Sequence, residues 1–255
     1  MLIIRNERFS NEEHYEWFKD YSHFRSIILD YVTLSASVLE LGCGNSQLCD
    51  NMYRDGITNI TCIDLSPVAV KKTQARLASA GMKGSTCLNN EHNRSGSAIS
   101  FYHTPFSEIK VLEADMLHLP FTEECFDVVI EKGTMDVLFV DSGDPWNPKP
   151  ESKDLVMSML REVHRVLKQD GIFISVTFGQ PHFRRPFFEA SEFSWSSEWK
   201  TFGDGFHYFV YILRKGGRDL SARELHTNFE RPSLSLIHEE LEDEDYIFRT
   251  AIDLD

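Results

Sequence analysis

The stretch Ser37-Val38-Leu39-Glu40-Leu41-Gly42-Cys43-Gly44 decides the fold. Its apolar run predicts a buried strand that ends in a tight turn, because glycine, which lacks a Cβ, lets the backbone bend sharply and approach a ligand. A second predicted strand, 59–63, ends at Asp64. In a doubly wound sheet the Asp64 carboxylate lies beside the same crevice, where it can accept both hydroxyls of a ribose. The two strand ends together predict a nucleoside-cofactor site.

Helices and strands are expected to alternate around this stretch. Ser10 and Glu13 have capping-box spacing, and Ser66-Pro67 places proline at a first helical position. Strands that alternate with helices predict a parallel sheet covered on both faces, the doubly wound α/β class. The expected helices span about 10–31, 46–55, 66–80 and 152–167, and the further expected strands span 111–113, 126–130 and 172–177.

The end of the chain has a different pattern. Segments 195–202 and 206–213, on either side of Gly203-Asp204-Gly205, predict an antiparallel β-hairpin. We expect residues 1–217 to form a single domain with 85–109 as a disordered insertion, because long loops without secondary structure are uncommon in compact domains. The remainder, 218–255, is polar and then acidic, which is typical of a solvated tail.

Composition narrows the classes of function. The chain has 255 residues with 40 acidic and 26 basic side chains, a formal net charge of −14. This charge disfavours nucleic-acid binding, since phosphate contacts need clustered Lys and Arg, but its field would attract a basic partner. The five cysteines form no CxxC pair, which is typical of a reduced, intracellular protein. With no signal peptide and no long apolar run, we expect a cytoplasmic monomer without a membrane span.

The choice of cofactor depends on position 47. A dinucleotide site has a third glycine there, where a helix N-terminus meets the pyrophosphate, but this chain has Gln47. The acid-x-Gly-x-Gly pattern at 40–44 resembles instead motif I of class I S-adenosylmethionine-dependent methyltransferases, whose cofactor has no pyrophosphate. Asp115-Met116 falls where such enzymes bind adenine, and the hairpin matches the antiparallel strand of their sheet. The resemblance implies a Rossmann-like, seven-stranded methyltransferase sheet with S-adenosylmethionine as cofactor.

Further segments resemble the eukaryotic lysine methyltransferases of translation elongation factor 1-alpha, within the methyltransferase-like family. The most specific is Glu131-Lys132-Gly133-Thr134-Met135-Asp136, and the similarity covers nearly the whole chain to about Gly217 except 85–109. Family members usually carry a Tyr-Trp pair a few residues before Phe9, and this chain lacks it. The resemblance implies methylation of a protein lysine, with elongation factor 1-alpha, a basic protein, as the expected substrate. The other matching segments are 15–18, 41–46, 181–184 and 205–208.

The resemblance also implies a role for individual residues. Asp64 with Leu65 is expected on the ribose side of the cofactor, and Lys132 near the cofactor carboxylate or the acceptor mouth. Asp136 and Glu131 are expected to orient the acceptor amine, so that the implied catalytic residues are Asp136, Lys132 and Glu131. The implied cofactor-binding residues are Phe9, Trp17, Glu40, Gly42, Gly44, Asp64, Leu65, Asp115, Met116 and Lys132.

Three other functions stay open from the sequence. A small-molecule methyltransferase differs only in the acceptor mouth, and a non-catalytic cofactor-binding protein is favoured by the missing aromatic pair. A nucleotide-dependent oxidoreductase is disfavoured by Gln47 and by the hairpin. His182 and His207 lack a third ligand at suitable spacing, so we predict no metal site.

Overall fold

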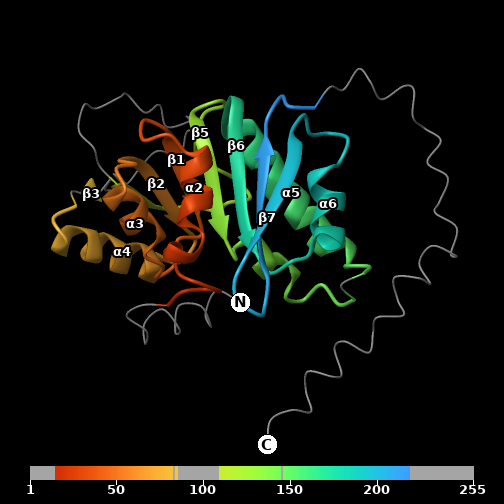
Figure 1. Cartoon of the computed structure of the whole chain (residues 1–255), viewed down its shortest axis with the longest axis horizontal. Helices are drawn as coiled ribbons and strands as arrows, with labels where there is room; N and C mark the ends of the chain where they lie inside the picture. The colour runs from red at the N-terminus through yellow and green to blue at the C-terminus, as the bar shows by residue number, and fades with distance from the viewer. Residues whose placement is uncertain (1–14, 83, 86–108, 145, 219–255) are drawn as a thin grey trace, which may run out of the picture. The chain divides into compact units, whose positions relative to one another are not determined.

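The computed structural model describes residues 15–82, 84–85, 109–144 and 146–218 (Figure 1). By its internal contacts the chain divides into Met1–Arg218 and Asp219–Asp255, and the second unit lies outside the described residues. Phe9, the capping box at Ser10 and all but the ends of the 85–109 segment also lie outside them. The predicted domain boundary and the predicted insertion therefore stay predictions.

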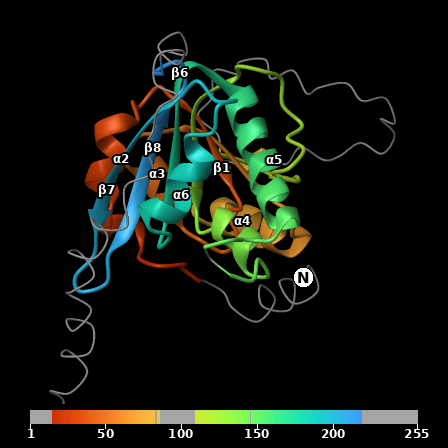
Figure 2. The ribbon, with the colours of Figure 1, turned by 90° about the vertical axis from the view of Figure 1, so that its right-hand side faces the viewer.

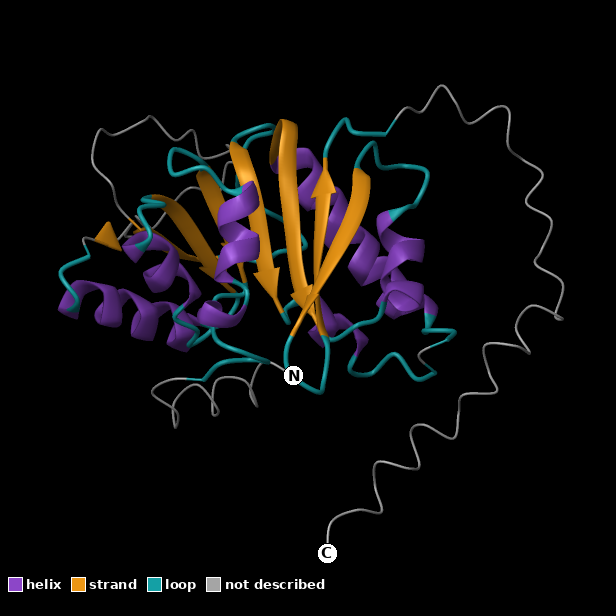
Figure 3. Cartoon of the chain, viewed as in Figure 1, coloured by secondary structure: helices purple, strands orange, loops and turns teal. Residues whose placement is uncertain are grey.

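The strands of the described residues form one sheet (Figure 3), in which their order is β3-β4-β2-β1-β5-β6-β8-β7. They are β1 (Ser37–Leu41), β2 (Asn59–Asp64), β3 (Gly84–Ser85), β4 (Ile109–Glu113), β5 (Phe126–Lys132), β6 (Leu167–Thr177), β7 (Ser196–Phe202) and β8 (Tyr208–Arg214). Strands β1 to β6 pair in parallel, and β8 is antiparallel to both β6 and β7. This confirms the doubly wound sheet and its hairpin. Seven long strands match the predicted number, and β3 adds a two-residue pair at one edge.

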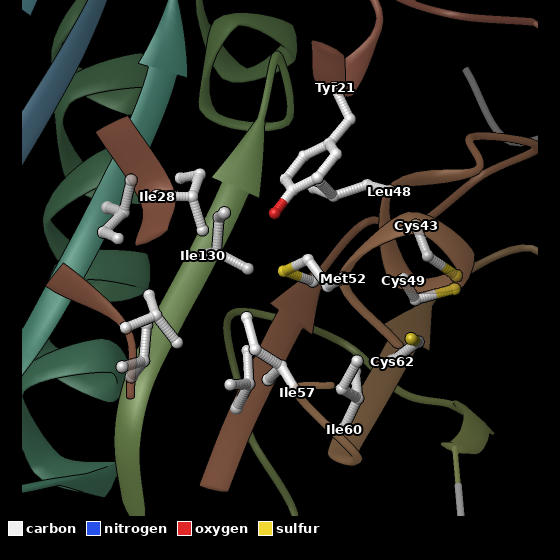
Figure 4. Close-up of a cluster of buried hydrophobic side chains, with 14 of the residues drawn as sticks. Tyr21, Ile28, Cys43, Leu48, Cys49, Met52, Ile57, Ile60, Cys62 and Ile130 are labelled. Carbon is white, nitrogen blue, oxygen red and sulfur yellow. The ribbon is translucent and has the colours of Figure 1, made fainter. Parts of the chain in front are cut away.

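Helices cover both faces of the sheet (Figure 2). Side chains from α2, α3 and α4 join one buried cluster, shown in part in Figure 4, and side chains from α5 and α6 join another. In β1, Val38 belongs to the first cluster and Leu39 to the second, because successive strand residues point to opposite faces. No helix in the described ranges is long and apolar enough to cross a membrane. The helices are η1 (Tyr21–His23), α2 (Arg25–Tyr31), α3 (Leu48–Arg54), α4 (Pro67–Ser79), η2 (Met135–Phe139), α5 (Pro150–Val166) and α6 (Pro181–Phe188).

The first predicted helix is wrong over residues 15–20, and its start at 10–14 lies outside the described residues. The expected helix over 10–31 has Trp17 and Phe18 on its apolar face, yet the described part of that range is helical only in η1 and α2. Phe18 has a φ of 63°, in the left-handed region that an α-helix cannot contain. Its ring packs instead on Phe178 and Tyr208, with ring centroids 5.6 and 5.4 Å away. This bend brings Trp17 to the carboxyl edge of the sheet.

Other boundaries also differ from the predictions. Helix α5 begins at Pro150, two residues before the predicted start at 152, and ends at Val166. Helix α3 follows Gln47, while the predicted cap Ser46 accepts a hydrogen bond from the Leu48 N–H at 3.2 Å. The predicted turn before 172 is part of β6, and α6 is not predicted at all.

Candidate active site

The glycine turn after β1 forms the floor of a cavity at the carboxyl edge of the sheet. Gly42 and Gly44 have φ values of 67° and 49°, a region that favours glycine. A Cβ on Gly42 would lie 2.4 Å from the Thr134 Oγ1, so a side chain does not fit there. Asp64, at the end of β2, fixes the turn from the other side. Its Oδ2 accepts the Gly44 N–H at 2.9 Å, and its Oδ1 accepts the Ser66 N–H at 2.8 Å.

This cavity holds most of the predicted cofactor residues. Leu65, Asp115 and Met116 do not line it, and Phe9 lies outside the described residues. Asp115 follows β4, the neighbour of β2, so it lies further along the same edge of the sheet. The predicted residues that line the cavity are Trp17, Glu40, Gly42, Gly44, Asp64 and Lys132.

Glu40 is the buried acid of this cavity. Its side chain is almost fully enclosed, and burial raises the pKa of Glu40 to about 7. The Cys62 thiol donates to its Oε2 at 3.4 Å. A carboxylate oxygen of Glu40 and the sulfur atoms of Cys49 and Cys62 lie within 4.8 Å of one another, close enough to be considered as metal ligands. The two cysteines are labelled in Figure 4. Burial raises the pKa of Cys62 well above its usual value, which disfavours the thiolate that a metal needs, so we assign these thiols to the core.

The segment just before η1 lines one side of the cavity with Tyr15 and Trp17, and we call this segment the roof. An ion pair between Lys132 and Glu16 holds it in place. The Lys132 Nζ donates to the Glu16 Oε2 at 2.5 Å and to the Trp17 carbonyl at 2.8 Å. Glu16 also accepts the Gln47 N–H at 2.8 Å and the Ser46 hydroxyl at 2.9 Å. Lys132 therefore lines the cavity as predicted, but its ammonium is held by Glu16. The sequence interpretation gave Glu16 no role, although it lies in the matching segment 15–18.

A second groove opens beside the cavity. Trp17, Gly133 and Val137 line both, so the two spaces share a wall. The rest of the groove is formed by Phe18, by η2 and the loop that follows it, by the residues after β6 and by the first turn of α6. Most of its surface is apolar. A methyl donor in the cavity and an acceptor in the groove would therefore be neighbours beside these three shared residues.

Asp136 is the polar centre of the groove. Its Oδ1 accepts the Thr177 hydroxyl at 2.6 Å and also the Arg184 Nη2. The side chains of Asp136 and Arg184 are only 8% and 6% exposed. The Asp136 Oδ2 is buried and has no hydrogen-bond partner among the described residues. A carboxylate oxygen without a partner can accept an N–H from a ligand in the groove once a small movement of the side chain exposes it. The sequence interpretation identified Asp136 but gave Thr177 and Arg184 no role.

Glu131, the third predicted catalytic residue, lines neither space. It is fully buried, and burial together with the nearby charge of Asp136 raises the pKa of Glu131 to about 7. Its Oε2 accepts the backbone N–H groups of Thr134 and Met135 at 2.7 and 3.1 Å, and its Oε1 accepts the Ser175 hydroxyl. These contacts shape the loop that carries Asp136, which favours a supporting role for Glu131.

A family model for a methyltransferase domain matches residues 39–175, the part of the chain that holds the glycine turn and Asp136. The chain belongs to this methyltransferase family. It is 36% identical over 211 residues to EEF1A lysine methyltransferase 4 of Mus musculus and 34% identical to that of Bos taurus. These matches cover 83% of this methyltransferase and 72% of each relative.

A solved methyltransferase structure has the same fold. Magnesium protoporphyrin IX methyltransferase from Synechocystis, solved with bound S-adenosylmethionine, has a TM-score of 0.51 at 13% sequence identity. The match covers 84% of this chain and 90% of that chain. This likeness confirms the predicted methyltransferase sheet. Membership of the methyltransferase family supports the predicted cofactor, S-adenosylmethionine. The cavity fits this cofactor, because the glycine floor leaves room for a close ligand and Asp64 lies at the strand end where a ribose binds.

Proposed function

We propose that this methyltransferase transfers methyl groups to a lysine of a protein substrate, eEF1A, in the cytoplasm and as a monomer. The names of the two relatives support this substrate. The observation that carries the proposal is the apolar groove that shares a wall with the cofactor cavity and has the unpaired Asp136 Oδ2 beside it.

The groove suits the side chain of lysine. Phe139, Phe178 and Phe183 line it and can enclose the apolar stem of a lysine. Phe206, in the matching segment 205–208, is exposed and does not line the groove. The Asp136 Oδ2 can then accept an N–H of the terminal amine, which aims the nitrogen lone pair away from Asp136.

The acceptor lysine must lose a proton before it can act as a nucleophile, since its ordinary pKa is about 10.4. Apolar surroundings lower that pKa, because they disfavour the charged form. Arg184 already neutralises Asp136, so the groove offers a hydrogen-bond acceptor without a net negative charge that would hold the ammonium. When bound, S-adenosylmethionine supplies an activated methyl group, so the main task of the protein is to position the amine.

Labelled S-adenosylmethionine tests this proposal. The methyltransferase is incubated with the labelled donor and either purified eEF1A or a whole cell extract, and labelled residues of eEF1A are located by mass spectrometry. We expect label on a lysine of native eEF1A and none after eEF1A is denatured. Label that enters only the small-molecule fraction of a cell extract would indicate a small-molecule methyltransferase. Cofactor binding without any transfer would indicate a non-catalytic protein.

A further inference from the structure

An exposed aromatic surface lies beside the groove. We call Trp146, His182 and Phe183 the aromatic platform. The Trp146 ring stacks on His182 with centroids 4.9 Å apart and planes 15° apart, and its centroid is also 4.9 Å from that of Phe183. Because Phe183 lines the groove, the platform is continuous with it. Trp146 is 75% exposed even though two rings hold it, so it presents a preformed apolar surface to solvent.

The apolar surface extends past the platform. Val140 is 72% exposed and Phe178 is 49% exposed, and both line the groove. Exposed apolar residues that gather at one place mark binding surfaces more often than isolated ones do. Tryptophan in particular is enriched among the residues that dominate the energy of protein interfaces.

The loop beside the platform carries two exposed acids, Asp141 and Asp144, and one exposed base, Lys149. Asp141 and Asp144 are exposed in the loop that leads to Trp146, and neither forms an ion pair with another described residue. The Asp144 Oδ1 accepts the Trp146 N–H at 3.0 Å, which orders this loop. Exposed acids beside an apolar surface complement a basic partner, and the net charge of −14 acts in the same direction.

We propose that the aromatic platform docks a basic surface segment of the protein substrate while its lysine enters the groove. This inference rests on the proposed function and deepens it. A small amine would fit within the groove and leave Trp146 uncovered, whereas a folded protein covers the groove and the platform together. The platform therefore contributes to recognition of a protein and takes no part in methyl transfer itself.

Trp146→Ala tests the inference in steady-state kinetics with purified eEF1A. We expect the KM for eEF1A to rise about tenfold, while kcat at saturation and the dissociation constant of S-adenosylmethionine stay within twofold. Trp146→Phe should restore most of the affinity, because the phenylalanine ring can still stack. Leu34→Ala is the matched control, since Leu34 is 58% exposed but precedes β1 at the opposite edge of the sheet.

The outcomes separate this inference from the proposed function. If the native chain methylates eEF1A and Trp146→Ala leaves the KM unchanged, the platform is not a docking surface although the function stands. If Trp146→Ala lowers kcat or the affinity for S-adenosylmethionine instead of raising the KM for eEF1A, the docking role of the platform is also overturned. If the native chain labels only small molecules, the protein substrate and the platform fail together.

Discussion

The cofactor cavity and the acceptor groove lie side by side, but they are built from different kinds of structure. The cavity floor is backbone: Gly42 and Gly44 adopt positive φ, and Asp64 binds main-chain N–H groups. The centre of the groove is made of side chains, where Asp136 meets Thr177 and Arg184 from β6 and α6. A local motif can specify a backbone turn, whereas only the assembled fold brings the groove residues together. Changes in the two regions should therefore have separable effects.

The largest expected effect is loss of cofactor binding in Gly42→Ala. The new Cβ would meet Thr134 at 2.4 Å, and alanine at a φ of 67° is strained. The turn escapes this crowding and strain, which together cost about 2–4 kcal/mol, only by leaving the conformation that binds the cofactor. The dissociation constant of S-adenosylmethionine should therefore rise about 100-fold in a calorimetric titration. Gly81→Ala is the control, because Gly81 has a φ of 70° and a Cβ added there would meet nothing within 4 Å. Equal losses in both variants would contradict the crowding argument.

The difference between the regions also explains what the sequence could predict. The glycine turn, Asp64 and the start of α4 at Ser66-Pro67 carry local signals, and all three are where the pattern indicates. The bend at Phe18 carries no such signal, because packing on Phe178 and Tyr208 overrides an apolar pattern that suits a helix. Local signals fix the ends of the central strands, and tertiary contacts fix the segment that crosses above them.

The same reasoning applies within the site. Asp136 could be predicted because it lies in a specific motif after β5. Its partner Arg184 is 48 residues away, and Glu16 is 116 residues from Lys132. No spacing rule connects positions so far apart, so these ion pairs become visible only in the folded chain. Glu131 lies in the same motif as Asp136, but the motif does not indicate that its side chain is buried. Its supporting role therefore also becomes visible only in the folded chain.

Asp136→Asn should mainly affect turnover. The amide replaces the charged acceptor that orients the amine, so we expect kcat to fall about 100-fold while the dissociation constant of S-adenosylmethionine stays within threefold. Removing one partner of a buried ion pair can itself destabilise a protein by about 3–5 kcal/mol. The double variant Asp136→Asn with Arg184→Met leaves no buried unpaired charge and should melt near the native temperature with the same low kcat. Loss of cofactor binding with normal turnover at saturation would show that Asp136 belongs to the cavity.

Glu40 gives the cavity region a pH-dependent stability. The pKa of Glu40 is about 7 in the folded chain, against an ordinary 4.5 when unfolded. At a pH between these two pKa values, Glu40 is deprotonated in the unfolded chain but still protonated in the folded chain. The free energy of unfolding therefore falls as the pH rises. From pH 5 to pH 8 this loss amounts to about 2–3 kcal/mol.

Glu40→Gln removes this titration, so urea denaturation should show the variant gaining stability relative to the native chain as pH rises from 5 to 8. The exposed Glu151, changed to Gln, is the control and should run parallel to the native chain. A Glu40→Gln curve that also stays parallel to the native curve would contradict the raised pKa.

The smallest expected effect concerns the roof, whose Trp17 lines both regions. Glu16→Gln weakens the contact that holds Trp17 over the cavity and the groove, so the dissociation constant of S-adenosylmethionine should rise about tenfold. Lys132→Met should have a similar effect, and the double variant should be no worse than either single one, because all three lack the same ion pair.

The exposed pair Lys200 and Asp30, neutralised in the same way, should leave the affinity unchanged. Fully additive losses in the Glu16 and Lys132 variants would mean that the two residues act separately, and the roof would then depend on the remaining contacts of Glu16 with the turn after β1.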